Sequence, residues 1–134
     1  MEIQIIAWFA VALLALAAGF QFGLAAGAPW GAAAYGGRAD RGGGALPGVY
    51  RLGSGVAGLA LLGATWVVLA SVSVVDRGPI SVRLLTVLLW CLAALFGLNT
   101  LGNARGQHPL ERWGAGTVTA LLAILCALIG SLAR

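Results

Sequence analysis

The chain has 134 residues, of which 60% are hydrophobic and only 9% are charged, and its mean hydropathy is +0.96. A soluble domain carries about 25% charged residues, so this composition excludes an ordinary soluble domain and favours a lipid bilayer as the surrounding solvent. The formal net charge of +4 comes from arginines between the apolar runs, where anionic lipid headgroups would neutralise them. We therefore expect the lipid bilayer as a partner and expect no nucleic acid.

The first apolar run, residues 5–27, exceeds the roughly 20 residues that cross the hydrocarbon core of a bilayer. It begins beside Glu2, whereas a secretory signal begins with basic residues, so we interpret it as a retained span; cleavage near its end is the alternative. Small residues recur at every fourth position and end with Gly19, Gly23 and Gly27. This ridge predicts close packing against another span of the chain or, as the alternative, a homodimer contact.

Residues 28–53 form the longest connection between apolar runs. Pro29 and Gly31 are predicted to end the first helix, which leaves Trp30 at the depth of an interfacial aromatic belt. The glycine-rich segment 36–44 lacks the Gly-Lys-Ser/Thr ending of a phosphate-binding loop, so we reject nucleotide binding. A flexible, basic, glycine-rich loop is expected here.

Three further spans are predicted at residues 54–75, 82–103 and 113–132. Ser54 is a typical N-cap residue and predicts the start of the second span. The fourth span has a stripe of small side chains, which we expect to pack against the glycine ridge of the first span. The stripe consists of Ala115, Thr119, Ala123, Ala127 and Ser131. With one long and two short connections, the sequence predicts a single domain, residues 1–134, that is an all-α, integral membrane, antiparallel four-helix bundle.

Arginine predicts the orientation of this bundle. The first and third connections hold five arginines, against three on the opposite side, so we expect these connections in the cytoplasm and both termini outside. The same five side chains form a predicted rim that could bind anionic headgroups. The rim consists of Arg38, Arg41, Arg51, Arg105 and Arg112.

Polar residues in three of the spans fall at one depth beneath this rim. At a rise of about 1.5 Å per residue, Gln21, Asn99 and Thr117 all lie about 22–24 Å from the side that holds the termini. Asn103 lies one helical turn beyond Asn99 on the same face. Hydrogen bonds between helices are one interpretation of this level. A polar pocket for an anionic lipid headgroup or a small amphiphile is the other.

Chemical function has little support in the remaining residues. Cys91 and Cys126 fall at a matching depth and are either small apolar side chains or a disulfide. Ionisable residues are absent from the middle of every predicted span, which argues against an ion- or proton-coupled transporter. Asp40 and His108 do not converge with Glu111, which we interpret as a charge that complements the helix dipole. We expect no metal, no cofactor and no enzymatic activity.

Short motifs give the chain a resemblance. They are Gly27-Ala28-Pro29-Trp30-Gly31, Gly36-Gly37, Leu46-Pro47, Arg51, Leu98-Asn99 and Glu111-Arg112. With these motifs the chain resembles small four-span integral membrane proteins of actinobacteria, whose function is unassigned. The resemblance implies the four-span architecture and a bacterial inner membrane, and it implies no catalytic residue and no ligand.

These observations lead to one expectation and one alternative for the function. We expect a non-enzymatic membrane protein that serves as an accessory or packing subunit, with another membrane protein or a further copy of itself as its partner. The alternative is a small transporter, or a protein that binds an anionic lipid or amphiphile, using the polar level beneath the arginine rim.

Overall fold

The computed structural model describes residues 2–39, 42 and 44–133, and within these residues it contains helices and no strand. The long helices are α1 (Glu2–Ala26), α2 (Gly48–Ser71) and α3 (Val82–Ala104). The last helix starts as a π-helical segment, η3 (Leu110–Ala115), and continues as α4 (Gly116–Leu132). In the described part of the chain, four helices are long and apolar enough to cross a membrane. The predicted all-α four-helix bundle is thus confirmed.

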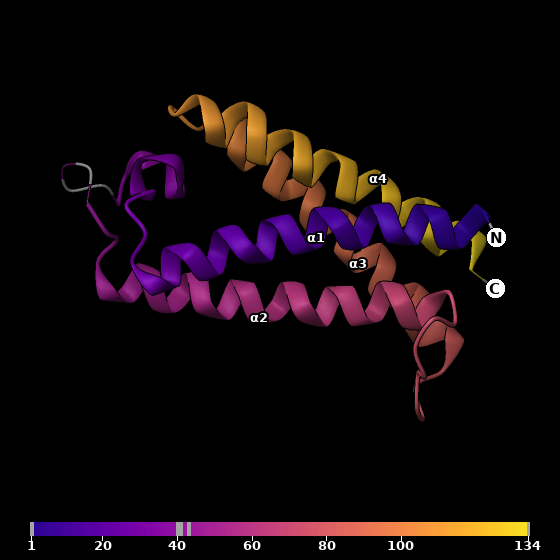
Figure 1. Ribbon diagram of the computed structural model, residues 1–134. Helices are drawn as coiled ribbons and strands as arrows, with labels where there is room; N and C mark the ends of the chain where they lie inside the picture. The colour runs from indigo at the N-terminus through magenta and orange to yellow at the C-terminus, as the bar shows by residue number, and fades with distance from the viewer. Residues whose placement is uncertain (1, 40–41, 43, 134) are drawn as a thin grey trace.

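The four helices form two pairs. α1 packs mainly on α2 and α3 mainly on α4, and the contact between α1 and α4 is the largest that joins the pairs. Figure 1 shows both chain ends at one end of the bundle, while α1 and α4 diverge toward the other end, where the connection from α1 to α2 lies. Apolar side chains from all four helices form the larger core. Its fully buried members include Leu14, Val68, Leu89, Leu122 and Ile129.

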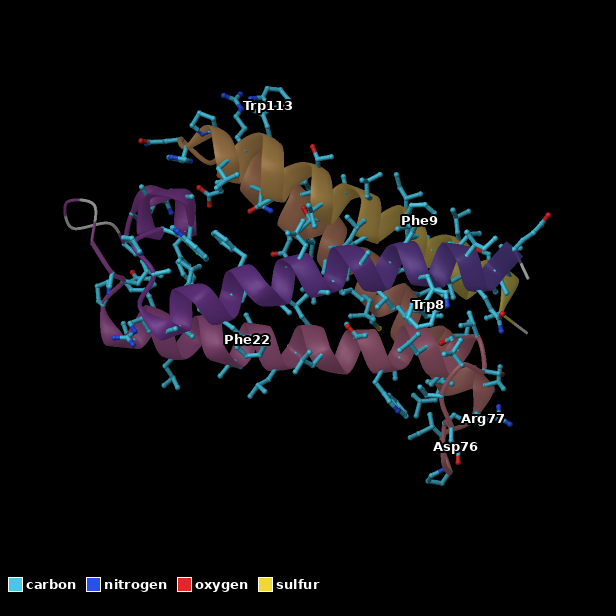
Figure 2. The ribbon with its side chains drawn as sticks, in the orientation of Figure 1. Trp8, Phe9, Phe22, Asp76, Arg77 and Trp113 are labelled. Carbon is cyan, nitrogen blue, oxygen red and sulfur yellow. The ribbon has the colours of Figure 1, made fainter. Side chains whose placement is uncertain are left out.

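The outside of the bundle is strongly apolar. Large aromatic side chains, among them Trp8, Phe9 and Trp113 (labelled in Figure 2), have between 54% and 71% of their surface exposed. Asp76 and Arg77, by contrast, lie together in the turn between α2 and α3 (Figure 2). Large apolar side chains that face outward, with the charges of the described residues confined to the turns and the helix ends, indicate a membrane protein.

The glycine ridge of the first helix does not pack against α4, so that prediction was wrong. No heavy atom lies within 4 Å of the Cβ position of Gly19, Gly23 faces the ring of Trp30, and Gly27 ends the helix with a φ of +100°. The reason is angular: four residues advance about 400° around the axis, so a strict four-residue line rotates by about 40° at each step. The buried face of α1 consists instead of Ala7, Ala10, Leu14, Ala18 and Leu24.

Small residues still allow close contacts, but on other helices. A Cβ atom on Gly58 of α2 would lie 2.7 Å from Cε1 of Phe22 on α1, so the Phe22 ring lies directly on the backbone of α2. Gly130 of α4 faces Trp90 of α3 in the same way, at 3.3 Å from Nε1. The stripe residues Ala123 and Ala127 are half-buried on α4. These glycines contact aromatic rings and not the glycine ridge.

The second helix begins six residues earlier than predicted, at Gly48. Pro47, with φ −56° and ψ 152°, is its N-cap residue, and Ser54 lies fully buried in the second turn. Ser54 is therefore no N-cap. Its hydroxyl is 2.8 Å from the hydroxyl of Tyr35. Its partner is therefore a side chain that is distant in the sequence, whereas an N-cap serine bonds to a backbone N–H of the first helical turn.

The connection between α1 and α2 is folded over the end of the bundle, whereas a flexible loop was expected. It contains two short 3₁₀ turns, η1 (Gly31–Ala33) and η2 (Tyr35–Gly37). Its apolar side chains form a second, smaller core with the end of α1. This core consists of Leu24, Ala34, Ala39 and Leu46, with Phe20 against it.

Candidate functional site

The four residues of the predicted polar pocket face different surroundings. Asn99 and Thr117 are exposed on α3 and α4, while Gln21 is half-buried and its Oε1 atom is buried without a hydrogen-bond partner among the described residues. The Nδ2 atom of Asn103 donates to Oγ1 of Thr119 at 3.4 Å. No hydrogen bond links any two of the four, and two of them are exposed, so they do not line one enclosed pocket.

A small polar network lies instead between α3 and α4. The hydroxyl oxygens of Thr100 and Thr119 are 2.9 Å apart, and the Asn103 amide donates to the same Thr119 oxygen. The sequence had placed Thr119 only in the stripe of small residues. Hydrogen bonds between membrane helices each contribute about 1 kcal/mol or less. For Asn103, this contact favours the interpretation as a link between helices.

The arginines of the predicted rim have different surroundings. Arg38 and Arg105 are exposed, and the guanidinium carbon of Arg112 lies 5.7 Å from the centroid of the Trp113 ring. Arg41 lies outside the described residues. Arg51 differs from the others because its side chain donates a hydrogen bond to the backbone at the end of α1.

Arg51 connects the start of α2 to the end of α1. Its Nε atom donates to the carbonyl oxygen of Ala25 at 2.9 Å, and its guanidinium lies 3.4 Å from the Cβ position of Gly27. A cation at the carbonyl end of a helix interacts favourably with the helix dipole. Arg51 is therefore a structural cap of α1.

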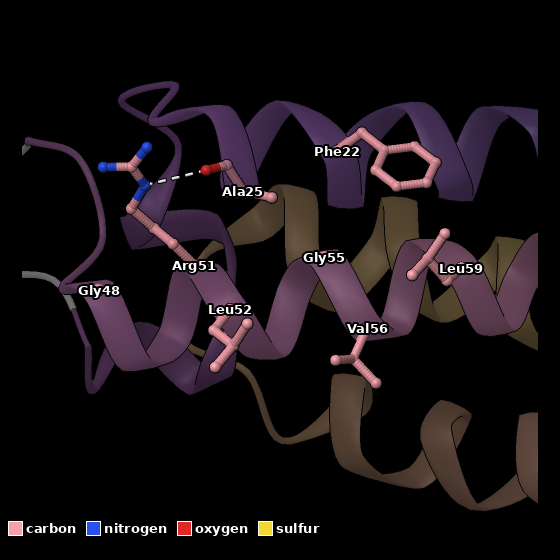
Figure 3. A pocket seen from close by; sticks show the side chains of 8 residues that line it. All are labelled: Phe22, Ala25, Gly48, Arg51, Leu52, Gly55, Val56 and Leu59. Carbon is pink, nitrogen blue, oxygen red and sulfur yellow. Dashed lines mark hydrogen bonds between the residues drawn. The ribbon is translucent and has the colours of Figure 1, made fainter.

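An open groove of about 540 Å³ runs beside Arg51 between α1 and α2. Figure 3 shows Arg51 at one end of the groove and Phe22 and Leu59 at the other. Small residues such as Ala25 and Gly55 form its floor, and among the described residues Arg51 is the one charged side chain that lines it. Sequence reasoning missed this groove because its apolar residues look the same as any other lipid-facing residues.

Glu111 is the second feature that the sequence did not reveal. It sits in the first turn of η3, where a charge that complements the helix dipole was expected, and only 6% of its surface is exposed. Oε1 accepts a hydrogen bond of 2.7 Å from the backbone N–H of Gly36, and Oε2 is buried without a hydrogen-bond partner among the described residues. A Cβ atom on Gly106 would lie 2.6 Å from Oε2, so glycine makes room for this carboxylate.

Tyr35 attaches the same connection to α2. Its hydroxyl donates to the carbonyl oxygen of Tyr50 at 3.2 Å or to Ser54 at 2.8 Å, and its φ of 54° is in the left-handed region. A non-glycine residue in that region costs about 1 kcal/mol or more, which these contacts offset. The connection is thus held by α2 through Tyr35 and by the start of the fourth helix through Gly36.

The remaining candidate groups do not converge. Cys91 is exposed, Cys126 is buried, and both are free thiols. His108 uses Nδ1 to accept from the backbone N–H of Leu110 at 3.2 Å, and Asp40 lies outside the described residues. In the described part of the chain, no group of three His, Cys, Asp or Glu side chains could hold a metal ion.

Comparisons of the chain with protein families, with curated proteins and with solved structures find no match.

Proposed function

We propose that this protein is a non-enzymatic integral membrane protein of a bacterial inner membrane, where it acts as an accessory or packing subunit. Its partner is a second copy of the chain or another membrane protein. One observation carries the proposal: Asn99 is an exposed amide on a helix that the bundle leaves largely uncovered.

Asn99 lies about 8 Å along the helix axis from the end of α3 at Ala104, at a rise of about 1.5 Å per residue. Its amide makes no hydrogen bond to another described residue. An unpaired amide in an apolar medium costs about 1–3 kcal/mol, and amide side chains are among the groups that hold membrane helices together. A partner helix that bonds Asn99 would recover this free energy.

The surroundings of Asn99 suit a close approach. Leu95 and Gly102 follow the i, i+4, i+7 spacing of one helix face with Asn99, and both are exposed. No heavy atom lies within 4 Å of the Cβ position of Gly102, so a second helix could come near the backbone there. Cys91, one turn before Leu95, is an exposed thiol on this face. We define Cys91, Leu95, Asn99 and Gly102 as the α3 face.

Native Cys91 provides the test. Treating membranes with a short bismaleimide should produce a covalent dimer that Cys91→Ser abolishes and that Asn99→Leu reduces several-fold. Thr117→Val is the matched control, because Thr117 is an exposed polar residue on α4. A chain that purifies in mild detergent as a monomer without an associated subunit, and that gives no crosslink through Cys91, would contradict the proposal.

A second candidate function has one observation in its favour. The alternative of a protein that binds an anionic lipid or amphiphile is supported by Arg51, the member of the predicted rim that lines an apolar groove. The predicted polar level supports it less, because Asn99 and Thr117 face outward.

A further inference from the structure

We propose that the groove between α1 and α2 is a binding site for an anionic glycerophospholipid. The Arg51 guanidinium would pair with the phosphate, and one acyl chain would lie along the apolar part of the groove. This inference rests on the membrane placement and on the second candidate function proposed above, and it does not depend on association through the α3 face.

The shape and lining of the groove fit an acyl chain. Its walls include Phe22, Val56 and Leu59, and small residues such as Gly55 leave the space between the helices open. A Cβ atom added at Gly55 would lie 3.8 Å from the Cβ atom of Ala25, so the backbone of α2 runs close to α1 at the floor. A linear hydrocarbon chain would therefore lie on a mostly apolar surface to which both helices contribute side chains.

The apolar part of the groove fits within one leaflet of a bilayer. From Arg51, where the phosphate would bind, it extends to Leu59 along α2, and eight residues at about 1.5 Å each give about 12 Å. Half of a hydrocarbon core of about 30 Å is about 15 Å. An acyl chain whose headgroup is at Arg51 would thus remain within one leaflet over its whole contact with the protein.

Arg51 is placed to receive the phosphate. Its Nε atom is held by the carbonyl oxygen of Ala25, which fixes the guanidinium at the end of the groove (Figure 3). Its two terminal nitrogens make no hydrogen bond to another residue in the described ranges. An arginine with both of these nitrogens free can bind a phosphate through two parallel hydrogen bonds.

Aromatic residues indicate that this end of the groove lies at headgroup level. Trp30, Tyr35 and Tyr50 are each between 36% and 45% exposed, and all three belong to the connection or to the first turn of α2. Tryptophan and tyrosine concentrate at membrane–water interfaces. The charge of Arg51 and the depth of its surroundings therefore both favour a lipid phosphate over an uncharged amphiphile.

The test uses the full chain, delipidated in detergent, with phosphatidylglycerol or phosphatidylcholine added and bound lipid counted by native mass spectrometry. Wild-type protein should retain phosphatidylglycerol about tenfold more strongly than phosphatidylcholine. Arg51→Gln should remove this preference, and Arg105→Gln, a change at an exposed arginine outside the groove, should retain it. Val56→Trp should weaken the binding of both lipids, because Val56 is 60% exposed and a larger side chain there fills the groove without entering the core.

Each other outcome has a defined meaning. Equal retention of the two lipids by wild-type protein, or an equal loss of preference in Arg51→Gln and Arg105→Gln, would overturn the proposal. Displacement of phosphatidylglycerol by millimolar inorganic phosphate would show a site for the free anion and would also overturn it. If Arg51→Gln does not fold, the retention of the two lipids is measured on Arg51→Lys and Val56→Trp instead. Crosslinking through Cys91 reports separately on association, so the two proposals can fail independently.

Discussion

The backbone N–H of Gly36 donates a hydrogen bond of 2.7 Å to Oε1 of Glu111, which lies 75 residues further along the chain. Gly36 belongs to the connection that leaves α1, and Glu111 belongs to the first turn of the fourth helix. The bond therefore joins the two helix pairs at the end of the bundle where they diverge (Figure 1). The hydroxyl contact from Tyr35 to Ser54 fixes the other side of the same connection on α2.

Replacing Glu111 should separate its role as an acceptor from its charge. Glu111→Ala leaves the Gly36 N–H without its partner, so we expect unfolding in detergent to become easier by about 1–3 kcal/mol. Glu111→Gln keeps the acceptor and removes the cost of burying a charge, so its stability should equal or exceed that of the wild type. Thermal denaturation followed by circular dichroism measures both. Equal destabilisation by Ala and Gln would show that the negative charge itself is required.

The lack of a side chain at Gly106 is expected to matter for stability only while Glu111 is present. A Cβ atom at Gly106 would lie 2.6 Å from Oε2 of Glu111, so Gly106→Ala must displace the carboxylate and should destabilise the protein by about 1–3 kcal/mol. In the Glu111→Ala background the same change should cost much less. Gly97→Ala is the matched control, because the Cβ position of Gly97 has no heavy atom within 4 Å. Additive losses in the double variant would refute this steric relationship.

The close contact between α1 and α2 gives a third prediction. Gly58→Ala places a Cβ atom 2.7 Å from the Phe22 ring and should lower the denaturation midpoint, whereas Gly19→Ala, with open space around it, should leave the midpoint unchanged or raise it. Phe22→Leu should recover part of the loss caused by Gly58→Ala, because the smaller side chain can move away from the new methyl group. A larger loss of the denaturation midpoint in Gly19→Ala than in Gly58→Ala would instead show that the glycine ridge is a packing surface.

The number of spans was predictable because hydropathy integrates over about 20 residues and needs no knowledge of contacts. The third span was predicted at 82–103 and is found at Val82–Ala104, where Ser81 caps the first turn by accepting from the N–H of Leu84. The start of the second span was predicted six residues too late, because Ser54 belongs to a residue type that often caps helices, whereas its hydroxyl contacts Tyr35. A contact between residues so far apart in the sequence cannot be predicted from the spacing of neighbouring residues.

The candidate site was harder to predict for a geometric reason. Depth along a helix follows from counting residues, whereas the direction in which a side chain points depends on how each helix is rotated against its neighbours. Gln21, Asn99 and Thr117 were grouped by depth alone, and Asn99 and Thr117 face outward. Glu111 was interpreted as a charge that complements the helix dipole, whereas it is buried and accepts a hydrogen bond from the glycine-rich connection.

The orientation of the bundle in the membrane remains a prediction from arginine, and labelling of single cysteines in a Cys91→Ser background can test it. Ala45 and Pro79 are exposed in the first and second connections, so cysteines introduced there should be reachable from one side each. If the first and third connections are cytoplasmic, an impermeant maleimide should label Pro79→Cys in intact cells and label Ala45→Cys only after lysis. Labelling of Ala45→Cys in intact cells would reverse the orientation. It would also place the Arg51 groove in the outer leaflet of the membrane. The proposed anionic lipid would then have to be present in that leaflet.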